Sequence, residues 1–226
     1  MSQPIKVLIA CDTFAPDING AAKFAERLAG GLVRNGNEVA IIAPSLDGWS
    51  GTRVEEHDGA KMTVHRLKSH KMPNHKSHRF TSPFGLSREL KRIILEQQPD
   101  ALHIQSHLMV GRFAMRATRG MSLRRIATNH TMPENLLKYS FVPKFMHPLA
   151  IKFLWWDAGR VLRKMDALTT PTRRAADLLE NSARVEGVLA ISCGIDATKF
   201  ANRTPTQNKE PVALFVGRLD NEKRIN

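Results

Sequence analysis

The sequence predicts an α/β fold, with an open, doubly wound, mainly parallel sheet. Two observations predict this class. Short continuous apolar runs are typical of strands buried on both faces, and segments of helical periodicity alternate with them. The length of 226 residues and the hydrophobic fraction of 42% suffice for one large domain or one and a half ordinary ones. The sequence has no run of about 18 uncharged apolar residues of the kind that spans a membrane.

The first three predicted elements form a strand–helix–strand unit. Residues 5–11 predict a strand buried on both faces, residues 21–34 an amphipathic helix and residues 39–43 a second buried strand. Residues 12–20, between the first strand and the helix, are rich in turn-forming side chains. A unit of this kind places its two strands parallel to each other in one sheet.

The same alternation continues along the chain. Residues 61–67 alternate polar and apolar side chains and predict a more exposed strand. The later predicted elements are, in order, helix 86–97, strand 101–105, helix 108–118, strand 125–129, helix 148–165, strand 167–170, helix 172–181 and strand 187–191. In open sheets of this class, ligands bind at the carboxyl ends of the strands.

The C-terminal residues predict a linker followed by the start of another domain. Residues 196–211 have the polar composition of a linker, and residues 212–217 (VALFVG) predict a buried strand. A lone strand cannot bury both faces, so this strand either joins the first sheet or begins a second, truncated domain. We favour the second interpretation. The expected division is a first domain over residues 1–200, a linker over 201–211, and the first strand and turn of the second domain over 212–226.

The positive charge is local and predicts an anionic partner. The chain has 34 Lys and Arg against 21 Asp and Glu, a net charge of +13. Residues 61–92 and 112–174 together carry a net +18, so the surplus lies in two stretches. Nucleic acid, a membrane surface or a phosphorylated substrate would each fit this charge, and the alternative is general solubility charge.

The two cysteines are too few for a disulfide scaffold, which favours a cytoplasmic protein.

The motifs that the sequence lacks, and those it has, narrow the classes of reaction and site to be considered. The sequence lacks the common dinucleotide, P-loop, zinc-protease and hydrolase motifs, and its histidines lack metal-ligand spacing, so we expect no metal site. Gly20, preceded by Asn19, lies where a ligand would meet the start of the first helix. His130 directly follows a strand, where an imidazole donates to a hydroxyl or an oxyanion and titrates near neutrality. Gln105 and His107 lie at the end of the preceding strand.

Two cations follow the last predicted strand. Arg218 and Lys223 could bind a diphosphate from a strand-to-helix turn. Each candidate also has a structural alternative: Gly20 as a plain turn residue, His130 as a capping histidine, and the two cations as part of a charged terminus.

Five segments, in this order, together resemble the family-4 retaining glycosyltransferases of the GT-B fold: FAPDINGAAKFAERLAGGLVRNGNEVAIIAP, PDALHIQS, ATNHT, CGIDATKF and FVGRLDNEK. The resemblance covers essentially the whole chain. It implies an enzyme that transfers a glucosyl or mannosyl unit from UDP-glucose or GDP-mannose to an acceptor, with retention and without a cofactor. It also implies a Rossmann-like, acceptor-binding first domain, and a truncated chain that is inactive alone.

The resemblance assigns roles to the candidate residues. It implies that Gly20 contacts substrate phosphates and the acceptor, and that His130 is the catalytic-site histidine near the transferred sugar. Arg218 and Lys223 match the pair that neutralises the leaving diphosphate, which would stabilise its charge without a metal. Asn19 stands where the family usually has a second glycine, so that contact is expected to differ.

The predicted helix 148–165 suggests a membrane contact. Its outward face carries aromatic side chains among cations, as interfacial helices do: Lys152, Phe153, Trp156, Arg160 and Arg163. In the alternative interpretation, Phe153 and Trp156 pack under residues 141–147 or under another domain. We expect a cytoplasmic protein, peripheral on the inner face of the plasma membrane, whose acceptor is a membrane lipid or else a saccharide.

The competing function is a non-catalytic α/β domain that binds sugar or nucleic acid. An aromatic content of 6% and the lack of a recognised binding module argue against nucleic acid as the partner.

Overall fold

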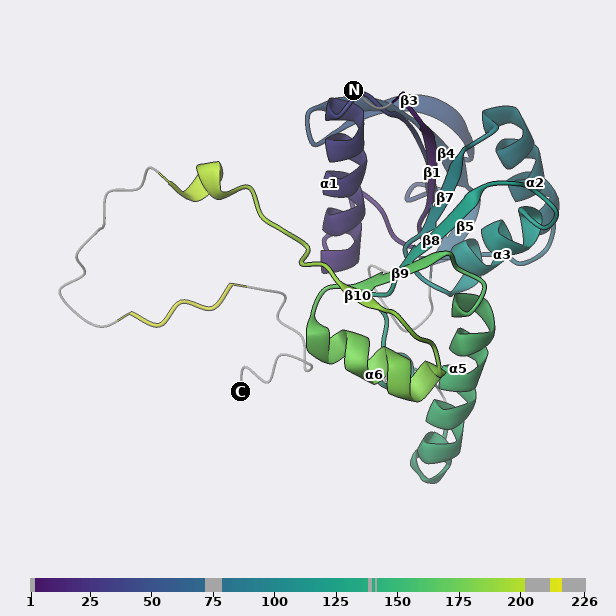
Figure 1. The fold of residues 1–226 in the computed structure, drawn as a ribbon, viewed down its shortest axis with the longest axis vertical. Helices are drawn as coiled ribbons and strands as arrows, with labels where there is room; N and C mark the ends of the chain where they lie inside the picture. Colours follow the sequence, from purple (N-terminus) through teal and green to yellow (C-terminus); the bar gives the residue numbers. More distant parts are fainter. Residues whose placement is uncertain (1–2, 72–78, 138–139, 141, 202–211, 217–226) are drawn as a thin grey trace. The chain divides into compact units, whose positions relative to one another are not determined.

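An eight-stranded sheet forms the centre of the computed structural model, which describes residues 3–71, 79–137, 140, 142–201 and 212–216 (Figure 1). Two units divide the chain, Met1–Cys193 and Gly194–Asn226, and the sheet belongs to the first. In spatial order the strands are β10 (Leu189–Ala190), β9 (Ala167–Thr170), β8 (Arg124–Thr128), β7 (Ala101–Ile104), β1 (Lys6–Ala10), β2 (Glu38–Pro44), β4 (Ala60–Leu67) and β3 (Gly51–His57). All neighbours pair parallel except β3 and β4, which confirms the predicted mainly parallel sheet.

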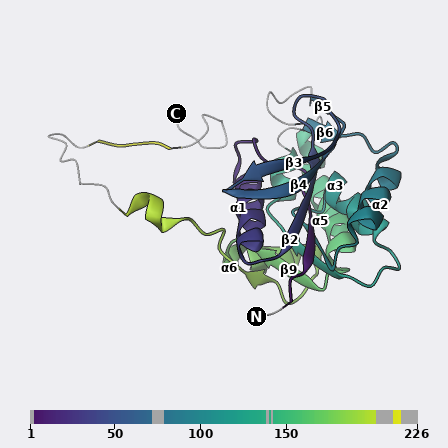
Figure 2. The same ribbon diagram turned by 90° about the horizontal axis from the view of Figure 1, so that it is seen from above.

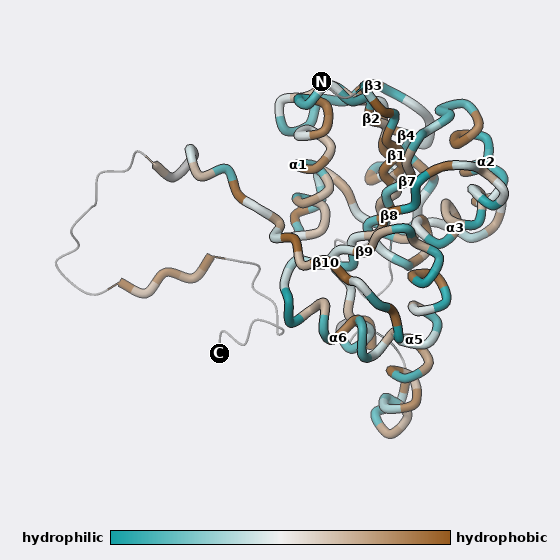
Figure 3. The backbone as a smooth tube through the Cα atoms, viewed as in Figure 1, coloured by the Kyte–Doolittle hydropathy of each residue, from teal (hydrophilic) through white to brown (hydrophobic). Residues whose placement is uncertain are grey.

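β1 lies at the middle of the sheet, so both its edges are paired and both its faces are covered. Leu8 is in register with Ala40 of β2 on one side and with Leu102 of β7 on the other. Figure 3 shows the strands around β1 as the hydrophobic centre of the unit. A strand in this position needs an unbroken apolar sequence, since its alternating side chains enter two different cores.

Helices cover both faces, as the doubly wound class requires (Figures 1 and 2). One core cluster packs α1 (Gly20–Arg34) against one face of β1, β2 and β4. The other cluster packs four helices against the opposite face: α2 (Leu86–Gln97), α3 (Met109–Ala117), α5 (His147–Leu162) and α6 (Arg173–Ala183). The shorter elements are β5 (Ser69–Lys71), β6 (Arg79–Thr81), α4 (Pro133–Leu137) and the 3₁₀ turns Lys144–Met146 and Ala197–Phe200.

The predicted exposure of strand 61–67 is wrong. β4 is largely buried, because β3, which the sequence did not predict, pairs with its outer edge in antiparallel register. β3 forms the exposed edge of the sheet instead, and its own sequence is polar (GTRVEEH). Edge strands tolerate such side chains, since only one of their edges is paired.

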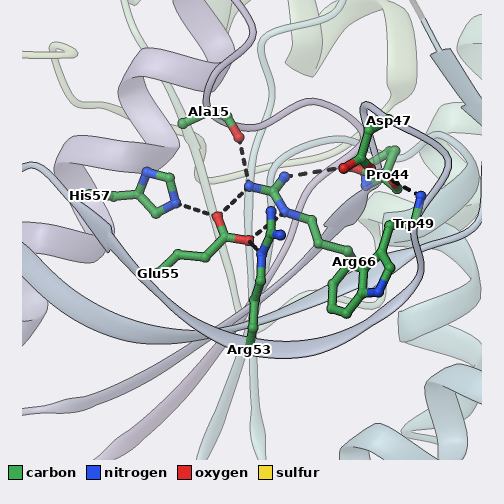
Figure 4. Close-up of polar contacts among 9 residues, drawn as sticks. Ala15, Pro44, Asp47, Trp49, Arg53, Glu55, His57 and Arg66 are labelled. Carbon is green, nitrogen blue, oxygen red and sulfur yellow. Dashed lines mark hydrogen bonds and ion pairs between the residues drawn. The ribbon is translucent and has the colours of Figure 1, made fainter.

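A buried arginine ties this edge to the loop after β1 (Figure 4). Arg66 is 4% exposed and donates to the carbonyl oxygen of Ala15 at 2.8 Å and to both carboxylate oxygens of Glu55 at 2.9 and 2.6 Å. Burial opposes ionisation of Glu55, but hydrogen bonds from Arg66, Arg53 and His57 lower its pKa to about 2. The pair therefore remains charged at neutral pH and holds the loop in place.

Helices α5 and α6 approach each other closely at a glycine. A Cβ atom added to Gly159 would lie 2.2 Å from the carbonyl oxygen of Ala183, which no other residue type allows without a shift of the backbone. Nη1 of Arg163 donates to the same oxygen at 2.8 Å. Arg163 therefore secures the end of α6, although its side chain is also exposed.

The second unit contains little regular structure in its described part. The side chain of Asp196 caps the 3₁₀ turn Ala197–Phe200, accepting from the backbone N–H of Thr198 at 3.1 Å. Residues 212–216 are exposed and form neither helix nor strand, so the strand predicted there does not form in this chain. A buried strand needs hydrogen-bonded neighbours on both sides. That this segment starts a further domain remains a prediction.

We predict that Arg66→Ala lowers the free energy of unfolding by about 3–5 kcal/mol, because it leaves Glu55 short of its buried partner and the Ala15 carbonyl without its donor. The matched control is Arg53→Ala, which removes an exposed arginine from the same carboxylate and should cost no more than about 1 kcal/mol. Urea unfolding curves measure both values. Equal losses in the two variants would contradict the anchoring role of Arg66.

Candidate functional site

The loops at the carboxyl ends of β1 and β7 are joined by one carboxylate. Asp12 follows β1 and accepts hydrogen bonds from Oγ of Ser106, after β7, and from the backbone N–H of Val110 in α3 at 2.8 Å. Burial raises the pKa of Asp12, and these hydrogen bonds oppose that shift. A Cβ on Gly111 would lie 2.0 Å from the Ser106 carbonyl oxygen, so this glycine lets α3 begin directly against the loop.

Asn19 and Gly20 begin α1 at the same edge. Asn19 is the N-cap: its Oδ1 accepts from the N–H of Ala22 at 2.9 Å and its Nδ2 donates to Oγ1 of Thr13 at 2.7 Å. Gly20 is exposed and lacks a positive φ, and a Cβ atom added to it would have no atom of the described residues within 4 Å. The protein's own packing therefore does not require a glycine at this position.

His130 lies against the first turns of α1. Its ring centroid is 4.7 Å from that of Phe24, which α1 places one turn after Gly20. Burial lowers the pKa of His130 to about 4. The expectation that it titrates near neutrality is therefore wrong, and the imidazole is neutral at physiological pH. A neutral imidazole can donate from one nitrogen and accept at the other.

Five polar side chains gather at the ends of β7, β8 and β9, and we call them the carboxyl-edge cluster: Gln105, His107, Asn129, His130 and Thr170. Each has a buried polar atom without a well-aligned hydrogen-bond partner in the described part of the chain, and Gln105 has two, although the side chains of His107 and Asn129 are close enough to interact with each other. Buried polar atoms are normally paired, so several unpaired ones together are typical of a site that receives a polar ligand.

A hydrogen-bonded chain crosses the sheet beneath this cluster. Nε2 of His103 lies 2.8 Å from Oγ1 of Thr128, which lies 2.7 Å from Oγ1 of Thr169, so β7, β8 and β9 are linked in turn. His103 is 8% exposed, consistent with a core position. Burial, with the nearby His130, lowers the pKa of His103 to about 4, and burial, with the nearby Arg112, does the same for the pKa of His107.

The structure thus brings Gly20 and His130 to one edge, but not all predicted site residues are there. Arg218 and Lys223 lie outside the described residues. Sequence reasoning missed Thr170 as a site residue, although it ends a predicted strand, and a position at the end of a strand is the signal that identified His130. It also missed Asp12, because its partners are more than 90 residues away in sequence.

Four of the predicted membrane-contact residues lie on α5, and the fifth, Arg163, is its C-cap residue. Phe153 and Trp156 are 58% and 51% exposed, and their rings lie 5.6 Å apart. The guanidinium of Arg160 stacks over Trp156 at 4.9 Å, and Lys152 is exposed beside them. The inward face carries Trp155, whose Nε1 donates to Glu134 at 3.0 Å. The two exposed rings are therefore not packed under the described part of residues 141–147.

The described ranges contain neither a set of grouped metal ligands nor a membrane-spanning helix. No three or more His, Cys, Asp or Glu side chains in those ranges are arranged to hold a metal ion. None of the helices there combines the length and apolar character needed to cross a bilayer.

Comparison with known proteins finds a matching family model and two similar enzymes with related names. The family model described as Glycosyltransferase Family 4 matches residues 18–199. A "GDP-mannose-dependent alpha-mannosyltransferase" of Mycolicibacterium smegmatis is 27% identical over 98% of this chain and 58% of its own length. An "Alpha-monoglucosyldiacylglycerol synthase" of Streptococcus pneumoniae is 23% identical over 98% of this chain and 48% of its own. The chain thus spans about half the length of these relatives.

The fold is also found among solved structures. The sucrose-phosphate synthase of Thermosynechococcus elongatus superposes with a TM-score of 0.63 at 14% identity, over 87% of this chain and 49% of that one. This likeness agrees with the predicted Rossmann-like, GT-B type of fold.

We predict that acid destabilises the protein through its buried histidines. The pKa of His103 is about 4 in the folded protein, below the ordinary value of 6.5, so the unfolded chain binds the proton first as the pH falls. The stability that the neutral, buried imidazole contributes is complete above pH 6.5 and is lost as the pH falls toward 4. Between pH 7 and pH 5, each such histidine is expected to lower the free energy of unfolding by about 2 kcal/mol. His103→Gln should remove its share of that loss. Urea unfolding at both pH values measures it, and an unchanged pH dependence would refute it.

Proposed function

Because the chain belongs to glycosyltransferase family 4, we propose that it provides the acceptor-binding part of an enzyme that transfers a hexosyl unit from a nucleotide sugar to a membrane lipid. The observation that carries this proposal is the carboxyl-edge cluster. Its unpaired polar atoms are buried at the end of the sheet where open α/β folds bind ligands, and sugars and their acceptors present hydroxyl groups that would pair with them.

We propose roles for the residues at the two ends of this site. A neutral His130 can hydrogen-bond a sugar hydroxyl without repelling a developing positive charge on the sugar ring. Gly20 leaves room for a phosphate or an acceptor to approach the start of α1, where backbone N–H groups favour an anion. Asn19 holds that turn through its capping hydrogen bonds, so we assign it a positioning role.

The donor is proposed to bind residues beyond the first unit. Arg218 and Lys223 would neutralise the leaving diphosphate, so that its departure needs no metal. We propose a first domain over residues 1–200, a linker over 201–211 and the start of a donor-binding domain over 212–226. The name of the Mycolicibacterium relative favours GDP-mannose over UDP-glucose as the donor. Retention of the anomeric configuration is part of the same proposal.

The acceptor is proposed to be a lipid at the inner face of the plasma membrane. The name of the Streptococcus relative denotes a monoglucosyldiacylglycerol product. On this chain, the exposed pair Phe153 and Trp156 beside Lys152 and Arg160 has the composition of an interfacial helix face. Arg163 would add charge there only to the extent that its bond to α6 permits.

We predict that the protein, expressed in its complete reading frame, releases nucleoside diphosphate from GDP-mannose or UDP-glucose and transfers the sugar to a diacylglycerol-type lipid. His130→Asn and Lys223→Ala should each lower kcat/KM by about a hundredfold, the effect of losing one transition-state hydrogen bond or cation. Steady-state assays over a panel of nucleotide sugars measure this, with thermal unfolding as the control for folding. Turnover that neither change affects would refute both assignments.

We also predict that Phe153→Ser combined with Trp156→Ser weakens binding to anionic vesicles by about tenfold or more, since two aromatic side chains no longer enter the interface. The matched control is Val54→Ser with Leu95→Ser, which removes two exposed apolar side chains elsewhere on the surface. Vesicle co-sedimentation measures both. If the control loses as much binding as the α5 variant, α5 is not the contact.

A further inference from the structure

A basic pocket lies between α3 and α5, and one of its lining residues, Arg112, also lies near His107 of the carboxyl-edge cluster. Its volume is about 360 Å³, at the small end of the range for ligand sites. Six cationic side chains contribute to its lining: Arg112, Arg116, Arg119, Arg125, Arg160 and Lys164. Asp157 is the one acidic residue of that lining.

The carboxylate of Asp157 is already paired with an arginine of the pocket. Arg112 binds both oxygens of Asp157, with Nη1 at 2.9 Å from Oδ1. No salt bridge within the described ranges joins the other five cations to a carboxylate. Five like charges around one pocket repel one another, and a bound anion would offset that repulsion.

Three of the arginines are held in place before any ligand binds. Nη2 of Arg125 donates to the carbonyl oxygens of Thr118 and Met121 at 2.8 and 2.9 Å. The guanidinium of Arg116 lies 5.2 Å from the ring centre of Phe113, and that of Arg160 stacks on Trp156. Fixed guanidinium groups offer paired N–H donors whose spacing matches phosphate oxygens.

We propose that this pocket binds a phosphate group, and that the group is the headgroup of an anionic phospholipid. The phosphate chemistry rests on the pocket alone, whereas the lipid source rests on the proposed membrane function. Arg160 connects the two: it lines the pocket, stacks on Trp156 and lies two helical turns, about 10 Å, from Phe153. A lipid whose headgroup enters the pocket would lie beside these exposed rings.

The test compares two charge-matched triple variants of the full chain. The pocket variant is Arg116→Gln, Arg119→Gln and Lys164→Gln, all exposed side chains whose loss spares the core. The control variant removes the same charges from α2 and α6: Arg88→Gln, Arg174→Gln and Lys91→Gln. Calorimetry with inorganic phosphate and co-sedimentation with phosphatidylcholine vesicles, with and without phosphatidylglycerol, are the two measurements.

We expect the pocket variant to bind inorganic phosphate and phosphatidylglycerol vesicles about tenfold more weakly than the control variant does. Loss of phosphate binding with unchanged vesicle binding would support the phosphate site and overturn the lipid source in favour of a soluble phosphorylated ligand. If the unmodified chain binds inorganic phosphate but no vesicles, the phosphate site is supported, and both the lipid source and the proposed membrane function are overturned. Equal effects in the two triple variants would overturn the pocket.

Discussion

The geometry of the candidate site depends on a half-buried carboxylate, Asp12. It is the second residue after β1, and through Ser106 and the N-terminus of α3 it fixes the loop after β1 to the loop after β7. Three residues after Asp12, the carbonyl of Ala15 accepts a hydrogen bond from Arg66 of β4. The loop is thus anchored at two points before it reaches Gly20. This anchoring defines where α1 starts.

This anchoring explains how distant residues come to share one site. Since α1 starts at a fixed point, Phe24 meets the ring of His130, and the end of β8 is placed opposite the start of α1. The threonine chain from His103 fixes β7, β8 and β9 beneath it. Burial lowers the pKa of each site imidazole and keeps it neutral, so recognition at this edge rests on hydrogen bonds.

Much of the fold was predictable from sequence because its signals are local. Apolar runs and helical periodicity identified the parallel strands and the major helices, and His130 was found because it directly follows such a run. β3 was missed because Arg53, Glu55 and Glu56 resemble a loop unless the neighbouring strand is known. For the same reason, the pattern of residues 61–67 could not reveal that another strand covers them. Arg66 and Ala15 are 51 residues apart, so their bond has no local signature.

The separation of charge from the carboxyl-edge cluster has a physical rationale in the proposed enzyme. A nucleotide-sugar diphosphate and an anionic membrane would compete for any cations that both could reach, and a strongly basic edge would retain the released diphosphate. The described cations of the α3–α5 pocket instead lie on these helices, just after their ends, or at the start of β8, whereas the cluster at the carboxyl edge of the sheet presents neutral side chains. One domain can then bind a charged surface with one part and exchange polar ligands with another. The lining of the pocket, with six cations and one acid, contributes to the chain's net charge of +13.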